Sequence, residues 1–198
     1  KVTDENKITW NYTLENDEIV EIKYESGEIQ ENLYIPSYLN GYPLTKIQAD
    51  AFESNMNLKN VIIPKTVKEI GYGAFWVCRN LVSIEIDEDS ALTKIGNQAF
   101  EGCESLTSIK IPNKVTSIGG SAFSDCSNLD NITIPDTVTS IDRYAFYGCS
   151  SLSEVKLNEG LTTIGTYAFS MSGLVTVNIP STVESIEDYA FFKLSSLT

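Results

Sequence analysis

The stretch "AFSDCSNLDNITIPDTVTSIDRYAFYGCSSL", at residues 122–152, begins and ends on the same phrase. An Ala-Phe pair is followed by cysteine three residues after the phenylalanine and by leucine six residues after it, and the phrase returns after 23 residues. A period of this length predicts a solenoid of stacked repeats. Ala-Phe pairs begin at residues 51, 74, 99, 122, 145, 168 and 190.

Each repeat unit divides into short apolar segments and turns. Ile109 and Ile111 alternate as in a strand, and Pro112 ends that strand because it has no N–H to donate. "VTSI" at residues 115–118 predicts a second extended segment, and "AFxxC" predicts a single turn, because it is too short for a stable helix. A glycine then follows many of the isoleucines and is expected to mark a corner with unusual backbone angles. These glycines are Gly71, Gly96, Gly119 and Gly165.

One unit cannot fold alone. It buries about six large side chains, each worth roughly 2 kcal/mol, whereas ordering its backbone costs about 1–2 kcal/mol per residue. Neighbouring units must therefore cover its faces and complete its strand hydrogen bonds.

The two ends of the repeat array differ. Residues 7–24 predict a β-hairpin with its turn at "ENDE", so we expect a cap at residues 1–32 and a solenoid of about seven repeats at residues 33–198. At the other end Leu194 and Leu197 fall in core columns with nothing polar to close the stack, and we expect the natural protein to continue. The apolar faces expected of the hairpin comprise Ile8, Trp10, Tyr12 and Leu14 on one strand and Val20, Ile22 and Tyr24 on the other.

Composition excludes several classes of function. A net charge of −13 argues against binding to nucleic acid and to anionic membranes. The sequence contains no run of about 18 apolar residues, so we expect no membrane insertion in this segment. The chain has no histidine, which excludes His-dependent catalysis and His-ligated zinc. We therefore expect neither an enzyme nor a cofactor, although a hydrolase that uses paired carboxylates stays open as a remote alternative.

The cysteines occupy one column of the repeat. Asn55, Ser172 and Leu194 share that column, and a ligand or nucleophile position would not accept such replacements. Thiols strung along a stack of coils cannot all reach one zinc ion, and their Cβ atoms would lie too far apart for disulfides. The column, which holds Cys78, Cys103, Cys126 and Cys149, therefore predicts buried free thiols.

Two surfaces are candidates for binding. One is a column of tyrosines that precede successive Ala-Phe pairs: Tyr144, Tyr167 and Tyr189, with Tyr147 close by. These tyrosines form either an exposed aromatic strip or a set of stacked rings that holds neighbouring coils together, and we favour the second alternative slightly. The acidic knot Asp87, Glu88 and Asp89 is expected to be a solvated insertion rather than a calcium site. The outward strand positions offer Lys59, Val82, Glu85, Lys110, Thr133 and Lys156.

The phrases "IPDTVTSIDRYAFYGCSSL" (134–152) and "IPSYLNGYPLTKI" (35–47) resemble the leucine-rich repeats of the BspA-like family over residues 33–198. The resemblance implies a β-rich leucine-rich-repeat solenoid with short turns of helix, of the right-handed α/β superhelix class, after an N-terminal β-hairpin cap. It also implies a secreted or cell-surface bacterial protein that adheres to an extracellular protein or glycan. The alternative is a passive spacer that holds another domain, such as an enzyme, away from the cell. Asp87 and Asn158 depart from the family pattern, which has proline there.

Overall fold

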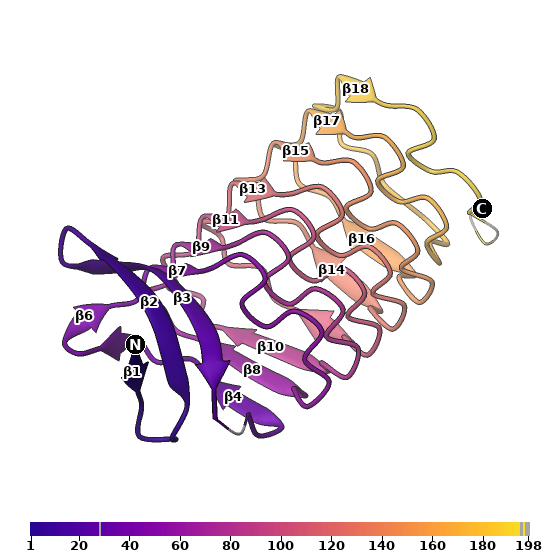
Figure 1. Cartoon of the computed structure of the whole chain (residues 1–198). Helices are drawn as coiled ribbons and strands as arrows, with labels where there is room; N and C mark the ends of the chain where they lie inside the picture. Colours follow the sequence, from indigo (N-terminus) through magenta and orange to yellow (C-terminus); the bar gives the residue numbers. More distant parts are fainter. Residues whose placement is uncertain (28, 195, 197–198) are drawn as a thin grey trace.

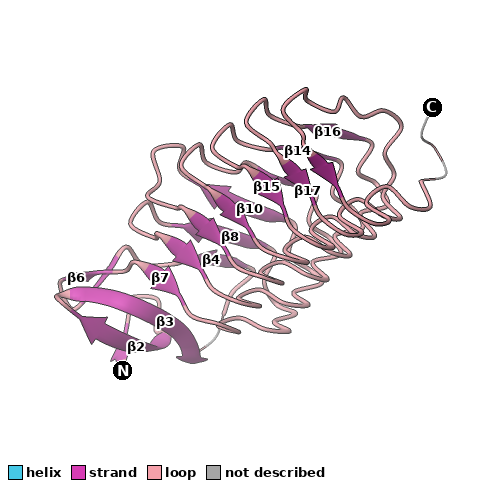
Figure 2. Cartoon of the chain, turned by 90° about the horizontal axis from the view of Figure 1, so that it is seen from above, coloured by secondary structure: helices cyan, strands magenta, loops and turns pink. Residues whose placement is uncertain are grey.

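The coils of the chain stack along one axis, from a hairpin at the N-terminus to the last coil at the C-terminus (Figure 1). The structure is a computed structural model that describes residues 1–27, 29–194 and 196. Each coil contributes short strands that align with those of its neighbours and are joined by loops (Figure 2). The predicted solenoid is therefore confirmed, whereas Leu197 lies outside the described residues.

The larger sheet joins the cap to the coils. Its order is β1-β2-β3-β7-β9-β11-β13-β15-β17-β18, antiparallel among the first three strands and parallel from β3 onward. The "VTSI" segments supply the strands of this sheet after β7, as predicted. The bounds are β1 Val2–Thr3, β2 Thr9–Glu15, β3 Glu18–Ser26, β7 Lys46–Ile47, β9 Glu69–Ile70, β11 Lys94–Ile95, β13 Ser117–Ile118, β15 Ser140–Ile141, β17 Thr163–Ile164 and β18 Ser185–Ile186.

The first segment of each repeat builds a second row of parallel strands. A four-stranded sheet has the order β12-β10-β8-β4, and β14 pairs with β16 beyond it. Ile84 is in register with Val61 and Ile109, so inward residues stack on inward residues. The bounds are β4 Asn32–Tyr34, β8 Asn60–Ile63, β10 Ser83–Ile86, β12 Ser108–Ile109, β14 Asn131–Thr133 and β16 Glu154–Lys156.

A ladder of phenylalanine rings runs through the interior. Consecutive rings lie 5.0–5.5 Å apart between centroids and are nearly parallel. Trp10 of the cap meets the first ring edge-on at 6.0 Å, so the cap continues the core. The ladder comprises Phe52, Phe75, Phe100, Phe123, Phe146, Phe169 and Phe191.

The Ala-Phe segments are turns, and no helix occurs among the described residues. The expected short turns of helix, and with them the α/β superhelix class, are therefore wrong. Within the turn, Phe75 N–H donates to Ala99 of the next coil and Trp76 N–H donates to Gly73 three residues earlier. Gly73 and Val77 have φ of 52° and 57°, and such left-handed residues four apart break any helix. Inter-coil bonds take the place of helical ones.

The glycines after the isoleucines do not supply these angles, which is a second correction. Positive φ falls two residues later, for example at Gln98 (57°) after Gly96 and at Tyr167 (57°) after Gly165, whereas Gly96 itself has no positive φ. A Cβ on Gly96 would lie 2.8 Å from the carbonyl carbon of Gly71 in the previous coil. These glycines are therefore required by close backbone approach rather than by unusual backbone angles.

The cap contains the predicted hairpin, but its buried face differs. Ile8, Trp10 and Ile22 are buried as expected, whereas Leu14 is 42% exposed and Ile19 is fully buried. The pairing of β2 with β3 shifts register between Thr13 and Leu14, which breaks the strict alternation that the sequence suggests. The half-buried members of the expected faces are Tyr12, Val20 and Tyr24. The division of the chain at residue 32 stays a prediction.

The insertion in the first repeat also forms a small hairpin. β5 (Tyr38–Leu39) pairs antiparallel with β6 (Tyr42–Pro43) around an Asn-Gly turn in which both residues have positive φ.

Candidate functional site

The cysteine column lies in the core and offers no reactive site. All four cysteines are free and fully buried, as predicted. Each thiol donates a hydrogen bond to a phenylalanine carbonyl one coil earlier, for example Cys78 to Phe52 over 3.0 Å. Burial raises the pKa of the Cys78 thiol to about 12, and a backbone hydrogen bond with Asn55 opposes part of the increase. Burial also raises the pKa of the other three thiols.

The acidic insertion does not gather its carboxylates. Asp87 accepts a hydrogen bond from the backbone N–H of Asp89 over 2.8 Å, and Glu88 pairs with Lys110 of the next coil. No cluster of three or more acidic or cysteine side chains is placed to hold a metal ion within the described ranges. The three residues form a solvated turn, as expected.

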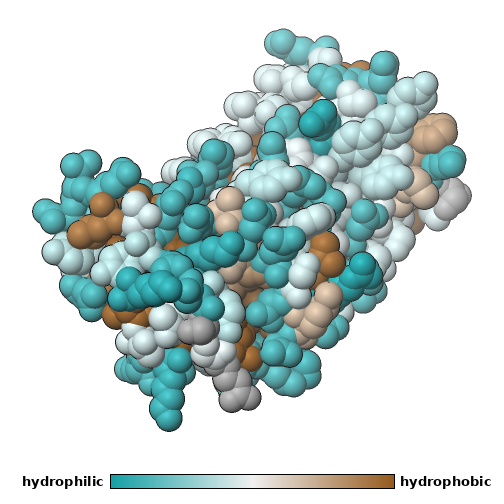
Figure 3. All heavy atoms as spheres, viewed as in Figure 1, coloured by the Kyte–Doolittle hydropathy of each residue, from teal (hydrophilic) through white to brown (hydrophobic). Residues whose placement is uncertain are grey.

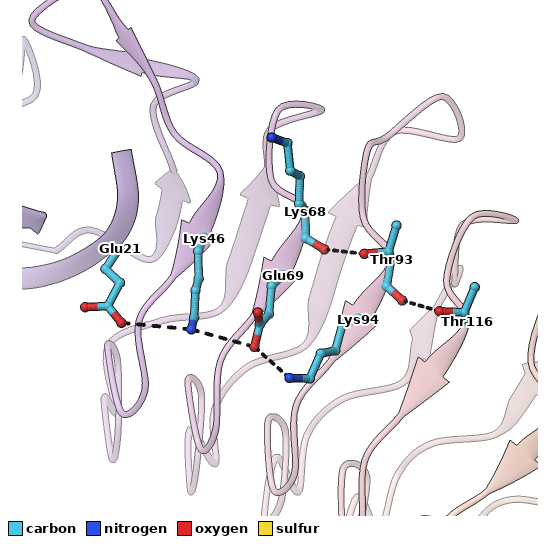
Figure 4. Close-up of polar contacts among 7 residues, drawn as sticks. All are labelled: Glu21, Lys46, Lys68, Glu69, Thr93, Lys94 and Thr116. Atoms are coloured by element: carbon cyan, nitrogen blue, oxygen red, sulfur yellow. Dashed lines mark hydrogen bonds and ion pairs between the residues drawn. The ribbon is translucent and has the colours of Figure 1, made fainter. Parts of the chain in front are cut away.

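On the outer face of the larger sheet, ion pairs link the cap to the first coils (Figure 4). Lys46 lies 3.9 Å from Glu21 of the cap and 3.8 Å from Glu69, and Glu69 also pairs with Lys94 at 3.0 Å. Beside this ladder, the Thr93 hydroxyl donates to a backbone carbonyl of the preceding coil. These charges link the cap to the first coils and are already partnered.

The outer face of the second row of strands is different. Glu85, Thr133 and Lys156 are exposed, and their side chains contact no hydrogen-bonding or charged partner among the described residues. Val82 is 39% exposed, and Lys59 pairs with a cap-side glutamate over 2.6 Å. We call the outward side chains of β4, β8, β10, β12, β14 and β16, together with Lys59, Val82 and Lys110, the strand face.

A broad hollow of about 980 Å³ lies on the strand face. It is open to solvent, and Ile62, Lys65, Glu85 and Lys110 contribute to its walls. A second hollow of about 390 Å³ continues across Lys110 to Thr133. The structure therefore brings Glu85, Lys110 and Thr133, from three successive coils, to one surface.

The aromatic end of the strand face is absent from the residues that the sequence singled out. Tyr34 is 59% exposed on β4 and stands in register with Ile62 on β8. The signal was available, because Tyr34 precedes Ile35-Pro36 as Lys110 precedes Ile111-Pro112.

The tyrosine column lies elsewhere, at the corner after the larger sheet. The ring centroids of Tyr144 and Tyr167 lie 5.1 Å apart, and those of Tyr167 and Tyr189 lie 4.9 Å apart. The stacked rings therefore hold neighbouring coils together, which is the alternative that we favour from the sequence. Loss of water around the Tyr167 phenol raises its pKa, and the neighbouring phenols and Asp188 add to the shift. Tyr147 donates from its hydroxyl to the sulfur of Met171 over 3.1 Å. Tyr189 is nevertheless 56% exposed, so the strip keeps a solvent edge.

The visible side of the molecule in Figure 3 is mostly hydrophilic or intermediate, with hydrophobic residues showing mainly around the cap and the nearby coils. No helix that is long and apolar enough to span a membrane occurs in the part of the chain that the structure describes.

The chain matches a family model and several solved structures. The model of the BspA type leucine-rich repeat region matches residues 17–91 and 85–198, with six copies. A leucine-rich cell surface protein from Faecalibacterium prausnitzii is 36% identical with a TM-score of 0.87, and the match covers 100% of this chain and 53% of that one. A leucine-rich repeat protein from Eubacterium ventriosum is 28% identical with a TM-score of 0.79, covering 98% and 50%.

A leucine-rich repeat protein of T. pallidum is 30% identical with a TM-score of 0.78, and the match covers 86% of this chain and 78% of that one. A search of curated protein sequences returns no match. The chain thus spans about half the length of the F. prausnitzii and E. ventriosum proteins. The family and these structures are repeat proteins rather than enzymes.

Proposed function

Because the chain belongs to the family of BspA-type leucine-rich repeat proteins, we propose that it is a binding module presented on or outside a bacterial cell. Its ligand is an extracellular protein or glycan, and the strand face is the surface that binds it. The similar protein of F. prausnitzii, described as a cell surface protein, supports the location.

The observation that carries this proposal is the contrast between two faces of the same coils. On the larger sheet, Lys46, Glu69 and Lys94 are engaged with one another and with the cap. On the strand face, Asn32, Asn60 and Ser83 link the first coils through side-chain hydrogen bonds, but Glu85 and Lys156 are exposed and unpaired. Glu85 lines the open hollow of about 980 Å³, and Lys156 is in register with Thr133, which lines its continuation. Side chains that do not serve the fold are available to a partner, and their mixed charge suits a polar, specific contact.

The test is a binding screen of the purified chain against immobilised fibronectin, laminin and collagen and against a glycan array. A variant with Glu85→Lys and Lys156→Glu reverses the two unpaired charges and keeps the net charge. A matched control with Glu53→Lys and Lys23→Glu changes exposed charges on a turn and on the cap instead.

We expect saturable binding to at least one probe, weakened about tenfold or more by the strand-face variant and unchanged by the control. Both variants are expected to keep the melting temperature of the native chain. Binding to none of the probes would contradict the proposal and favour a passive spacer. Equal loss in both variants would remove the strand face as the binding surface.

A further inference from the structure

A further hollow, of about 490 Å³, lies away from the strand face, at the corner where the tyrosine column begins. It crosses four successive coils, with Tyr72 at one end and Tyr144 at the other, and Asn97, Gly120 and Arg143 contribute to the part between them. Three coil-to-coil steps separate the two rings, roughly 15 Å at strand spacing. We call this hollow the corner groove. It shares no residue with the strand face.

One coil lacks a side chain in the corner groove. In the position two residues after the buried isoleucine, the fourth coil has Gly120, which is buried. A Cβ at Gly120 would lie 3.3 Å from Cγ of Arg143, so the arginine side chain of the next coil lies close over this bare backbone. The same position in successive coils holds Ala49, Tyr72, Asn97, Gly120, Arg143, Thr166 and Asp188.

The two rings at the ends offer free faces. Tyr72 is 51% exposed, no other aromatic ring stacks on it in the described chain, and it also borders a hollow of about 260 Å³ on its other side. Tyr144 is half-buried: Tyr167 covers one face, Tyr147 meets the ring at a steep angle over 5.6 Å, and the ring lines the corner groove. The face of an aromatic ring carries negative potential and attracts the C–H bonds of a sugar ring.

The polar groups between the rings are donors. Asn97 accepts a hydrogen bond from Gly120 N–H over 3.0 Å through its side-chain oxygen, which leaves its NH₂ group free to donate. The Arg143 side chain is exposed and forms no ion pair or hydrogen bond with any described residue. No acidic residue lines the corner groove, although the chain carries a net charge of −13. An unpaired guanidinium in such surroundings suits a carboxylate or sulfate group.

From the two exposed ring faces, the free Asn97 amide group, the unpaired Arg143 guanidinium and the lack of acidic residues in the lining, we infer that the corner groove binds a short acidic oligosaccharide. Sugar rings stack on Tyr72 and Tyr144, the Asn97 amide donates to a hydroxyl group, and Arg143 binds the anionic substituent. The inference rests on the proposed function and specifies a ligand class for a surface other than the strand face.

Isothermal titration calorimetry of the native chain with three tetrasaccharides tests the inference. Tetragalacturonate presents carboxylates, a chondroitin sulfate tetrasaccharide presents sulfates as well, and cellotetraose is neutral. We expect one or both acidic probes to bind and the neutral probe to bind about tenfold more weakly or not at all. Comparison of the two acidic probes identifies the anionic group.

Single-residue variants show which side chains of the corner groove contact the oligosaccharide. Arg143→Gln and Tyr72→Ala should each weaken acidic-probe binding about tenfold, whereas Arg79→Gln, which removes an arginine paired with Glu104, should change nothing. Gly120→Asn should also weaken binding, because its side chain would displace that of Arg143, and circular dichroism melting verifies that each variant folds. Failure of both acidic probes, equal binding of cellotetraose, tighter binding of a hexaglutamate peptide or equal loss with Arg79→Gln would overturn the inference. The strand-face variant reports on the proposed function separately, because it should leave tetrasaccharide binding intact.

Discussion

The thiol of Cys126 donates a hydrogen bond to the backbone carbonyl oxygen of Phe100, one coil earlier, over 3.2 Å. The same contact recurs from Cys103 to Phe75 and from Cys149 to Phe123. A cysteine column in this fold therefore links adjacent coils from within. It is small enough for the core and carries a weak donor, which adds a second hydrogen bond to a carbonyl oxygen that already accepts one within its own turn, as Phe100 does from Cys103 N–H.

Thiol labelling tests this role. We expect none of the four cysteines of the native chain to react with a thiol reagent such as DTNB, because their side chains are fully buried. All four should react promptly in guanidinium chloride. Rapid labelling of Cys126 in the native chain would show that the coils open, and mass spectrometry of the labelled peptides would locate the reactive thiol.

The buried thiols also make the fold sensitive to alkali. In the unfolded chain cysteine loses its proton near its ordinary pKa of 9.0, whereas burial raises the pKa of Cys78 to about 12 in the fold. The folded chain therefore holds more protons between these two values, and its stability falls as pH rises through this window. Below pH 9 this contribution is fully present. Urea unfolding measured from about pH 8 to pH 11 should show the decline.

The slope of the unfolding free energy against pH shows whether the thiols cause the decline. Each thiol contributes up to about 1.4 kcal/mol per pH unit to the decline, because one pKa unit corresponds to that free energy. Cys126→Ala should therefore unfold with a shallower pH dependence than the native chain, even though its stability at neutral pH is lower. The same slope in both proteins would mean that Cys126 does not contribute to the alkaline decline and would contradict this prediction.

Ser172 occupies the cysteine column without a hydrogen-bond partner for its buried hydroxyl among the described residues. Ser172→Ala should raise the free energy of unfolding by about 1 kcal/mol, because a buried unsatisfied hydroxyl group is costly. Ser170→Ala is the matched control: its hydroxyl donates to the carbonyl of Phe192 over 3.0 Å, so its loss should be destabilising. Urea denaturation compares the two, and equal destabilisation would mean that Ser172 has a partner.

The stack of coils could be predicted from the sequence because the apolar columns recur in register. Every copy of Ala-Phe occupies the equivalent interior position of its coil, so Phe123 and Cys126 could be assigned to the core without a structure. The register of the strands follows from the same columns. Ile84 beside Ile109 is an example.

The turns and the cap could not be predicted in the same way. Gln98 and Tyr144 adopt left-handed angles although neither residue type favours them, because inter-coil hydrogen bonds fix the backbone there. The register shift near Leu14 likewise depends on how β2 meets β3 and leaves no periodic signal.

The candidate surfaces were only partly predictable. Alternation on a strand places Glu85 and Lys156 outward, and this much is visible in the sequence. The corner groove is not, because it depends on Gly120 lying between larger side chains of neighbouring coils. The stacking of Tyr144 on Tyr167 followed from the repeat period, whereas the free faces at Tyr72 and Tyr144 required coordinates.

We propose that the inward columns hold the coils together and leave the strand face free for a ligand. Urea unfolding of two variants measures this directly. Phe123→Ala should lose about 3–5 kcal/mol of stability, because it removes a fully buried ring from the ladder. The triple variant Lys110→Ala, Thr133→Ala and Lys156→Ala should lose less than about 1 kcal/mol. A triple variant as destabilised as Phe123→Ala would contradict the claim, because the strand face would then be structural.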